Sequence, residues 1–176
     1  MKNLSLPCVG ICIFLCPLFY GSCNEDEDEL PPITMEGKNT FGCFVNGKLF
    51  ITKAPIGQSG LHAEISTYPD TVGVIIYASN SSVNKVLVIS IYDSPTLQTG
   101  KSYDLTNPNF QVQYTDYANT NSCTYESVQN GFITLSKFDL SKSIVSGTFQ
   151  FDIFGSNCKD SISITQGRFD TSELIR

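Results

Sequence analysis

Apolar and polar residues alternate with a period of two along most of the chain after Thr40, the pattern of β-strands that bury one face. No stretch longer than a turn combines helical periodicity with caps at both ends. The pattern predicts about ten strands joined by short polar turns. They cover residues 41–45, 48–52, 61–66, 72–78, 83–92, 110–115, 122–128, 132–138, 144–154 and 161–169. We therefore expect an all-β fold, a single antiparallel β-sandwich or partly closed barrel.

Two of the expected turns contain an Asn-Gly pair. Asn46 and Gly47 separate the first two strands, and both residue types readily adopt the positive φ angles of a type I′ turn, which predicts a tight hairpin. The triplet Gln-Asn-Gly at 129–131 separates segments 122–128 and 132–138 in the same way. We expect these two segments to form another hairpin.

The last two expected strands have the clearest alternation. Phe149, Phe151 and Ile153 fall on one face of their strand, and Ile162 and Ile164 can face the same core from the next strand. This predicts a C-terminal hairpin that contributes a large part of the core.

The first 22 residues have the features of a secretory signal. Lys2 is the only charge, and the run from 4 to 20 is apolar apart from Ser5. Pro7 and Pro17 interrupt this run, and it is short for a membrane-spanning helix. A cleaved signal peptide over residues 1–22 is therefore the better interpretation.

Cys23 follows this run directly, after the small residues Gly21 and Ser22. This arrangement resembles the lipobox of bacterial lipoproteins, in which the cysteine thiol receives a diacylglyceryl group and becomes the new N-terminus. Three other cysteines lie within the apolar run and lack a polar mature end: Cys8, Cys12 and Cys16. The alternative is an ordinary signal peptide in which Cys23 is an incidental thiol.

Residues 23–36 form an expected lipidated acidic tether, and residues 37–176 the β domain. Five consecutive acids at 25–29 would repel an anionic membrane, so the lipid must provide the attachment to the membrane. The acidic run resembles the surface-export signal of Bacteroidota lipoproteins; the alternative is a solvated spacer facing the periplasm. We expect a lipid-anchored outer-membrane protein, with export to the outer face favoured.

The formal net charge of −6 resides almost entirely in the tether, because the chain from Gly37 onward has 10 Lys or Arg against 11 Asp or Glu. The absence of a basic excess argues against nucleic acid as a partner. The length of 176 residues fits a single domain, and 41% hydrophobic residues are enough for a core.

Sequence motifs at both ends of the domain carry a resemblance. They are Gly-Lys-Asn-Thr-Phe-Gly-Cys-Phe-Val-Asn-Gly-Lys at 37–48, Ser-Gly-Thr-Phe-Gln-Phe at 146–151 and Thr-Gln-Gly-Arg-Phe-Asp at 165–170. With the acidic Leu-Pro-Pro spacer, they resemble a family of small uncharacterised Bacteroidota lipoproteins. The resemblance implies a β domain on a lipid anchor at the outer membrane, and it implies no chemistry.

Candidate catalytic chemistry is sparse. His62, the only histidine, falls on the polar face of its strand beside no nucleophile motif. No ligand spacing typical of a metal site is present, and no glycine loop for a phosphate. We therefore expect no enzyme, no catalytic residues, no metal and no cofactor.

Three cysteines remain in the β domain. Cys43 alternates with apolar neighbours and is expected to point into the core. Cys123 lies near a strand start and Cys158 in a turn, which makes them the candidate disulfide in a compartment that permits oxidation. The alternative is two free thiols.

A cluster of tyrosines is interspersed with asparagines between residues 103 and 125. Tyrosine and asparagine are typical of adaptable recognition surfaces. The candidate recognition surface comprises Tyr103, Tyr114, Tyr117 and Tyr125. The alternative is cross-strand aromatic pairing within the sheet.

The function that these features favour is a non-enzymatic binding or interaction module, displayed on a membrane anchor, whose partner is an unknown glycan or protein ligand. The first alternative is a structural envelope protein that assembles with its neighbours through strand edges. The second is a hydrolase that uses carboxylates distant in sequence.

Overall fold

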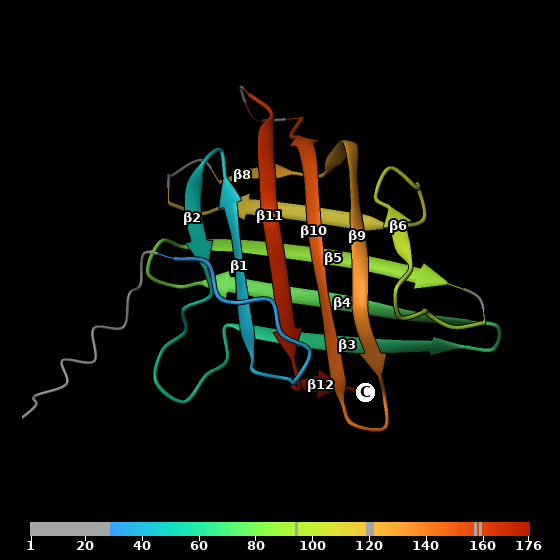
Figure 1. Ribbon diagram of the computed structural model, residues 1–176. Coiled ribbons are helices and arrows are strands. Elements are labelled where there is room, and N and C mark those ends of the chain that lie inside the picture. The colour runs from blue at the N-terminus through green and yellow to red at the C-terminus, as the bar shows by residue number, and fades with distance from the viewer. Residues whose placement is uncertain (1–28, 94, 119–121, 157, 159) are drawn as a thin grey trace, which may run out of the picture.

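The computed structural model describes residues 29–93, 95–118, 122–156, 158 and 160–176, and Figure 1 shows its twelve strands in two six-stranded sheets. Sheet A has the order β2-β1-β11-β10-β9-β6, and sheet B the order β12-β3-β4-β5-β7-β8. The strands are β1 Thr40–Val45, β2 Lys48–Ile51, β3 Leu61–Tyr68, β4 Thr71–Asn80, β5 Lys85–Asp93, β6 Ser102–Asp104, β7 Gln111–Asp116, β8 Cys123–Tyr125, β9 Ser127–Asp139, β10 Ile144–Phe154, β11 Ile162–Thr171 and β12 Leu174–Ile175.

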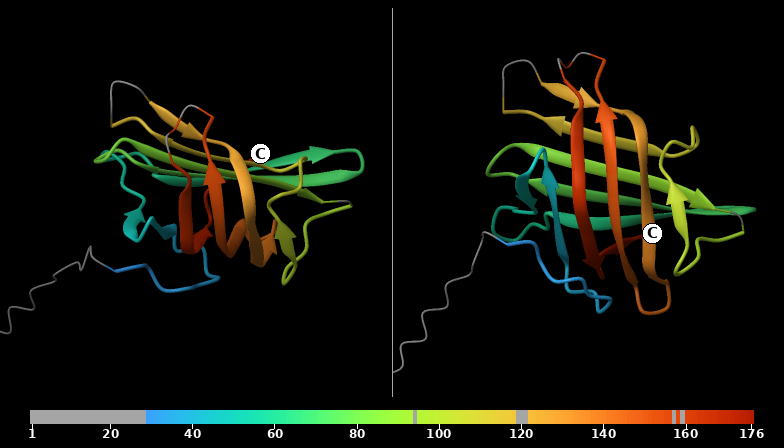
Figure 2. Two further views of the ribbon diagram at one scale, coloured as in Figure 1. Left: turned by 90° about the horizontal axis from the view of Figure 1, so that it is seen from above. Right: turned by 45° about the horizontal axis from the view of Figure 1, so that its top comes forward.

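The two sheets lie face to face, and the strands of sheet A run across those of sheet B (Figures 1 and 2). All neighbouring strands are antiparallel except β12, which pairs in parallel with β3. The inner faces bury one core between the sheets, whose largest fully enclosed side chains include Phe41, Leu61, Ile76, Leu87, Ile89, Ile133, Leu135, Phe149 and Ile153. The expected all-β fold is confirmed, and of the two architectures the sandwich is the one observed. No helix in the described part of the chain has the length and apolarity to cross a membrane.

The predicted hairpin at Asn46-Gly47 is confirmed. The φ angles are 48° at Asn46 and 75° at Gly47, as a type I′ turn requires, and β1 pairs with β2 on either side of it. The turn matches the right-handed twist of the two strands, so the local sequence alone specifies this connection.

The predicted C-terminal hairpin is also confirmed. β10 and β11 pair antiparallel, and Phe149, Phe151 and Ile153 are at most 2% exposed. Gln150, between two of them, points to solvent. The register is therefore the one that the alternation predicted.

The predicted hairpin around residues 129–131 is wrong. β9 continues through the triplet, with a register shift near Gln129, and β8 pairs with β7 in the other sheet. Gly131 has a φ of 140°, and a Cβ there would lie 2.3 Å from the Phe151 Cβ. β6 pairs with β9 only from Phe132 to Thr134, so the earlier part of β9 lies at the edge of the sheet. Polar residues are tolerated in this part of the strand because the edge is accessible to solvent.

Residues 30–38 form an N-terminal strap that crosses the outer face of sheet A (Figure 1). Asp170 accepts hydrogen bonds from Thr34 and from three strap amides, and Arg168 donates one to the Pro31 carbonyl. The boundary expected at residue 37 is therefore too late, because residues 30–36 already belong to the domain. The expected signal peptide, the lipidation site Cys23 and the acids up to Asp28 lie outside the described residues.

Candidate functional site

The four tyrosines of the expected recognition surface do not form one. Tyr103 and Tyr114 are 4% and 2% exposed and belong to the core, Tyr125 is half-buried, and only Tyr117 is exposed. Tyr103 lies on β6 of sheet A, whereas Tyr114 and Tyr125 lie on β7 and β8 of sheet B. This prediction is wrong: crossed sheets leave a wide interior, and large inward side chains fill it.

The environments of the two buried tyrosines explain the burial. The Tyr114 ring lies 6.3 Å from that of Phe50 and 6.1 Å from that of Tyr125, so it bridges the two sheets. The Tyr103 hydroxyl accepts a hydrogen bond from the Gln98 amide at 2.9 Å and donates one to Asp93 at 3.2 Å. Both rings are therefore core residues, and the hydroxyl of Tyr103 is hydrogen-bonded within the domain.

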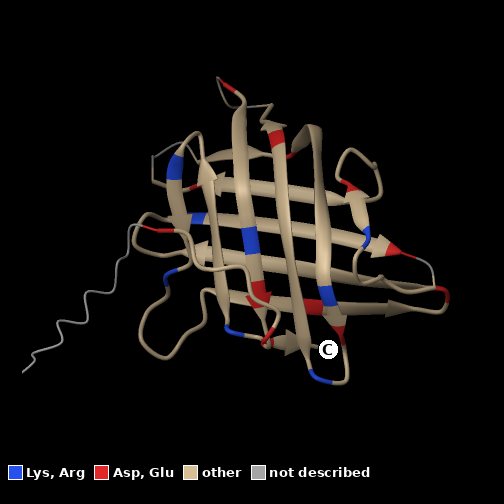
Figure 3. Cartoon of the chain, in the orientation of Figure 1, with Lys and Arg blue, Asp and Glu red and all other residues tan. Residues whose placement is uncertain are grey.

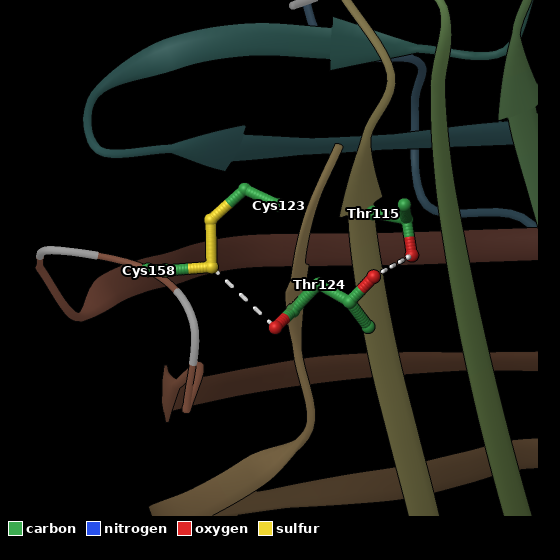
Figure 4. The surroundings of a disulfide bond; sticks show 4 residues. All are labelled: Thr115, Cys123, Thr124 and Cys158. Carbon is green, nitrogen blue, oxygen red and sulfur yellow. Dashed lines mark hydrogen bonds between the residues drawn. A yellow bond between two sulfur atoms is a disulfide. The ribbon is translucent and has the colours of Figure 1, made fainter. Parts of the chain in front are cut away.

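Cys123 and Cys158, the pair singled out from the sequence, form a disulfide in the structure, with Cα atoms 5.7 Å apart (Figure 4). Cys123 begins β8 and Cys158 lies between β10 and β11, so the bond links sheet B to sheet A. The Cys158 sulfur is also 3.5 Å from the Thr124 carbonyl oxygen. Cys43 is a buried free thiol, and desolvation raises its pKa to about 12, so it is inert as a nucleophile.

His62 lies on the outer face of sheet B and stacks on Tyr77, with ring centroids 4.9 Å apart. Within the described ranges, no group of three or more His, Cys, Asp or Glu side chains is placed to hold a metal ion.

The most distinctive surface lies on the outer face of sheet A, around Phe132, whose side chain is 41% exposed. On one side of the ring is a hollow of about 510 Å³, which is also lined by Ser102, Asp104, Thr106, Gln129, Asn130 and Gly131. On the other side is a hollow of about 220 Å³, lined with Ile33, Thr148, Phe149, Gln150, Gln166, Gly167 and Arg168. We call these residues together the Phe132 surface.

The alternation of β9 places Phe132 outward. Ile133 and Leu135 are fully buried, so Phe132 and Thr134 must face away from the core. Phe132 stands opposite Gln150 of β10 on one side and Asp104 of β6 on the other. Three neighbouring strands therefore place a carboxylate, an aromatic ring and an amide in one row.

The polar groups of the larger hollow are held by hydrogen bonds. Asp104 accepts from the Thr106 amide at 2.9 Å and from the Thr106 hydroxyl at 2.7 Å, and these bonds lower the pKa of its carboxyl. The Ser102 and Thr134 hydroxyl oxygens lie 2.6 Å apart. These side chains are therefore oriented before any ligand arrives.

Asn130 and Asp152 extend this row along the face. The Asn130 side-chain amide donates to Asp152 at 2.9 Å, and hydrogen bonds from Ser163 and Asn130 lower the pKa of the Asp152 carboxyl. Both carboxylates near the larger hollow are thus in the ionised form at neutral pH.

The N-terminal strap contributes to the smaller hollow through Ile33, which is 59% exposed. Arg168 is held beside it, because its guanidinium donates to the Pro31 carbonyl at 3.3 Å and to the Gln166 carbonyl at 3.2 Å. The strap therefore builds part of the candidate site as well as covering the sheet.

Sequence reasoning did not find the Phe132 surface. A signal was present, because Phe132 is a large aromatic residue at an outward position of its strand. The expected hairpin at 129–131 concealed it by assigning the residues before Phe132 to a turn. The placement of Asp104 beside the ring depends on β6 pairing with β9, thirty residues away in sequence, which no local pattern indicates.

The arrangement has the features of a ligand-binding surface. An exposed ring supplies an apolar platform, and fixed hydroxyls, amides and carboxylates around it supply hydrogen bonds. A family model described as "Domain of unknown function (DUF6252)" matches residues 63–171, which include all of the Phe132 surface except Ile33. Comparisons with curated proteins and with solved structures each returned no match. Because the family model spans more than half of the sequence, the chain belongs to the DUF6252 family.

Proposed function

We propose that this protein is a lipid-anchored envelope protein whose β domain is a non-enzymatic binding module for uncharged saccharides. The observation that carries the proposal is the exposed Phe132 ring between two hollows lined with hydrogen-bonding side chains.

A saccharide ring has an apolar face of C–H groups and a rim of hydroxyls. Phe132 can stack against such a face, while Asp104, Gln150 and Asn130 are placed around the ring to accept and donate hydrogen bonds. The larger hollow, about 510 Å³, falls in the range of small-ligand sites. Its open form suits part of an extended chain better than a small molecule enclosed on all sides.

Charge supports an uncharged ligand. In Figure 3, Lys and Arg are interspersed with Asp and Glu, and no strand carries a run of one sign. The near-balance of 10 basic and 11 acidic residues from Gly37 onward agrees with this. Nothing in the distribution would steer a polyanion to the domain.

The two alternatives have less support. Assembly through strand edges is favoured by long, flat edge strands, whereas the outermost strands β2, β6, β8 and β12 have only 4, 3, 3 and 2 residues; the longer unpaired edges belong to the parts of β9 and β3 that β6 and β12 do not reach. A hydrolase with two carboxylates needs one of them protonated as an acid, which requires a raised pKa. The pKa values of Asp104 and Asp152 are both lowered.

Binding is tested with the mature protein on an array of neutral oligosaccharides. Phe132→Ala should lower affinity at least tenfold, because it removes the stacking platform. Phe154→Ala is the matched control, since Phe154 is 39% exposed against 41% for Phe132 and lines neither hollow. Equal binding by the two variants would refute the proposed site, and no binding by the wild type would refute the ligand class.

The same proposal includes the location of the protein. The signal peptide at 1–22 is cleaved, Cys23 is lipidated, and the lipid anchors the protein on the outer face of the outer membrane of a Bacteroidota-type envelope. Two or three acyl chains hold a protein stably on a membrane. Cys23→Ala should abolish metabolic acyl labelling and detergent-phase partitioning. Acyl labelling that persists in this variant would show that another cysteine is lipidated.

Deleting residues 24–29 tests the proposed export signal separately. The deletion should leave the domain folded and membrane-associated, because it removes no strand, but protease should no longer reach it from outside the cell. Unchanged protease access would mean that the acidic run is a spacer and not an export signal.

A further inference from the structure

Three exposed apolar side chains lie at one end of the sandwich. Ile56 is completely exposed in the connection between β2 and β3, Val83 is 45% exposed in the β4–β5 turn, and Tyr117 is 54% exposed just after β7. They come from three separate connections, so no single loop sequence places all three at this end.

Hydrogen bonds tie these connections together. The Lys53 amide donates to the Ser79 carbonyl at 3.0 Å, and the Ser81 amide donates to the Lys53 carbonyl at 2.9 Å. The Tyr117 amide donates to the Asn84 carbonyl at 2.9 Å. The three connections therefore form one surface, which we call the exit end.

The segment that leads from the domain back towards Cys23 leaves the domain at this same end. Glu29 and Pro31 line a hollow of about 300 Å³ together with Ile51 and Thr52, which lead into the Ile56 connection. The views in Figures 1 and 2 agree that residues 29–31 lie beside the connection between β2 and β3. The strap beyond this point is fixed by its bonds to Asp170 and adds no free length.

The length of chain before Glu29 limits how the domain can stand on a membrane. Cys23 precedes Glu29 by six residues, which span at most about 20 Å when extended. The strand β4, with its 10 residues, is itself roughly 33 Å long. A lipid on Cys23 therefore keeps the exit end within about 20 Å of the bilayer, whereas the opposite end of β4 can lie farther away.

We propose that the exit end docks on the lipid bilayer, with Ile56, Val83 and Tyr117 inserted among the headgroups. The proposal rests on the anchor at Cys23 proposed above. Aliphatic side chains and tyrosine are the types that partition into this interfacial layer. Lys85 is paired with Asp116 at 3.2 Å, so its charge is compensated at the surface. The short anchor raises the local concentration of the lipid surface, so three side chains suffice where they would not in a free protein.

The orientation has a consequence for ligand binding. β9 and β6, which line most of the larger hollow of the Phe132 surface, lie at the side of the molecule away from the exit end (Figure 1). Docking through the exit end leaves the Phe132 surface open to the medium.

The experiment uses the absence of tryptophan from the chain, which makes any introduced tryptophan a unique reporter. Ile56→Trp and Tyr117→Trp place the reporter at the exit end. Tyr68→Trp is the matched control, because Tyr68 is 61% exposed and ends β3 at the opposite end of β4. Each mature lipidated variant is reconstituted into phosphatidylcholine vesicles, with or without brominated acyl chains, and its flotation and fluorescence are measured.

We expect all variants to float with the vesicles, and brominated lipid to quench tryptophan at positions 56 and 117 at least threefold more than at position 68. Flotation with equal quenching at the three positions would overturn the docking proposal and leave the anchor intact. Failure of the proteins to float would overturn the anchor, and the docking proposal with it. A blue-shifted but unquenched tryptophan at position 56 would mean a protein contact there instead, and would also overturn docking on lipid.

Discussion

The Ser146 hydroxyl donates a 2.6 Å hydrogen bond to the Asp170 carboxylate, which is only 1% exposed because the N-terminal strap covers it on the outer face of sheet A. The two residues are paired partners on β10 and β11. The same carboxylate accepts from the Thr34 hydroxyl at 2.6 Å and from strap amides, of which that of Gly37 is the nearest at 2.8 Å. One buried charge thus joins the strap to the central hairpin, and every lone pair it presents is used.

Asp170 should make the stability of the domain pH-dependent. Burial alone would raise the pKa of its carboxyl, but hydrogen bonds from Ser146, Thr34 and the strap amides outweigh burial and lower the pKa to about 2. Because the unfolded value is near 3.9, the lowered pKa contributes about 2–3 kcal/mol of stability, which is fully present above about pH 5 and is lost as the pH falls through 2. Urea unfolding of the wild type across this range measures the loss.

Asp170→Asn is the reference for that measurement, because its side chain does not titrate. At pH 7 we expect it to be less stable than the wild type by about 2–3 kcal/mol. The difference between the two proteins should narrow steadily between pH 4 and pH 2. A difference that stays constant over this interval would mean that Asp170 is not the titrating group.

Phe151 and Gln150 are neighbours on β10 that point to opposite faces. Phe151→Ala should cost about 3–5 kcal/mol, because the side chain is 2% exposed and its removal leaves a cavity. Gln150→Ala should cost less than about 0.5 kcal/mol, because Gln150 faces solvent. Urea denaturation measures both, and a reversal of the two values would indicate a one-residue shift in register.

Gly131→Ala should destabilise the domain by more than backbone strain alone. Its φ of 140° suits glycine only, and the new Cβ would also lie 2.5 Å from the Gln150 carbonyl oxygen. We expect a loss above about 3 kcal/mol. Gly47→Ala is the matched control, since Gly47 has a φ of 75° and open space around it, and it should lose only about 1 kcal/mol. Equal losses from the two substitutions would refute a close approach of β9 to β10 at this position.

Removing the disulfide should loosen the contact between the sheets. The double variant Cys123→Ser with Cys158→Ser opens a link between residues 35 apart in sequence, which predicts a loss of roughly 2–4 kcal/mol. Dithiothreitol should destabilise the wild type by the same amount and leave the double variant unchanged. Sensitivity of the double variant to dithiothreitol would mean that a disulfide other than Cys123–Cys158 contributes to stability, and would contradict the assignment.

Local sequence was sufficient for the features that depend on local physics. The turn at Asn46-Gly47 follows from residue types that tolerate positive φ, and the faces of β10, and of β11 before its irregularity at Gln166, follow from a period of two. The pairing of Cys123 with Cys158 could be proposed because few partners were available. None of these features needed knowledge of the strand that lies alongside.

The tertiary structure decided the features that depend on a neighbour far away in sequence. Tyr114 is a core residue because Phe50 of the other sheet lies against it. Position 131 of β9 requires glycine because Phe151 on the neighbouring strand leaves no room for a Cβ. The strap is part of the domain because Asp170, more than 130 residues later, accepts its hydrogen bonds. The row that includes Asp104 and Phe132 exists only once β6 has paired with β9. The alternation along the chain specifies which side chains share a face, whereas burial and proximity arise from packing between sheets, for which a linear pattern contains no information.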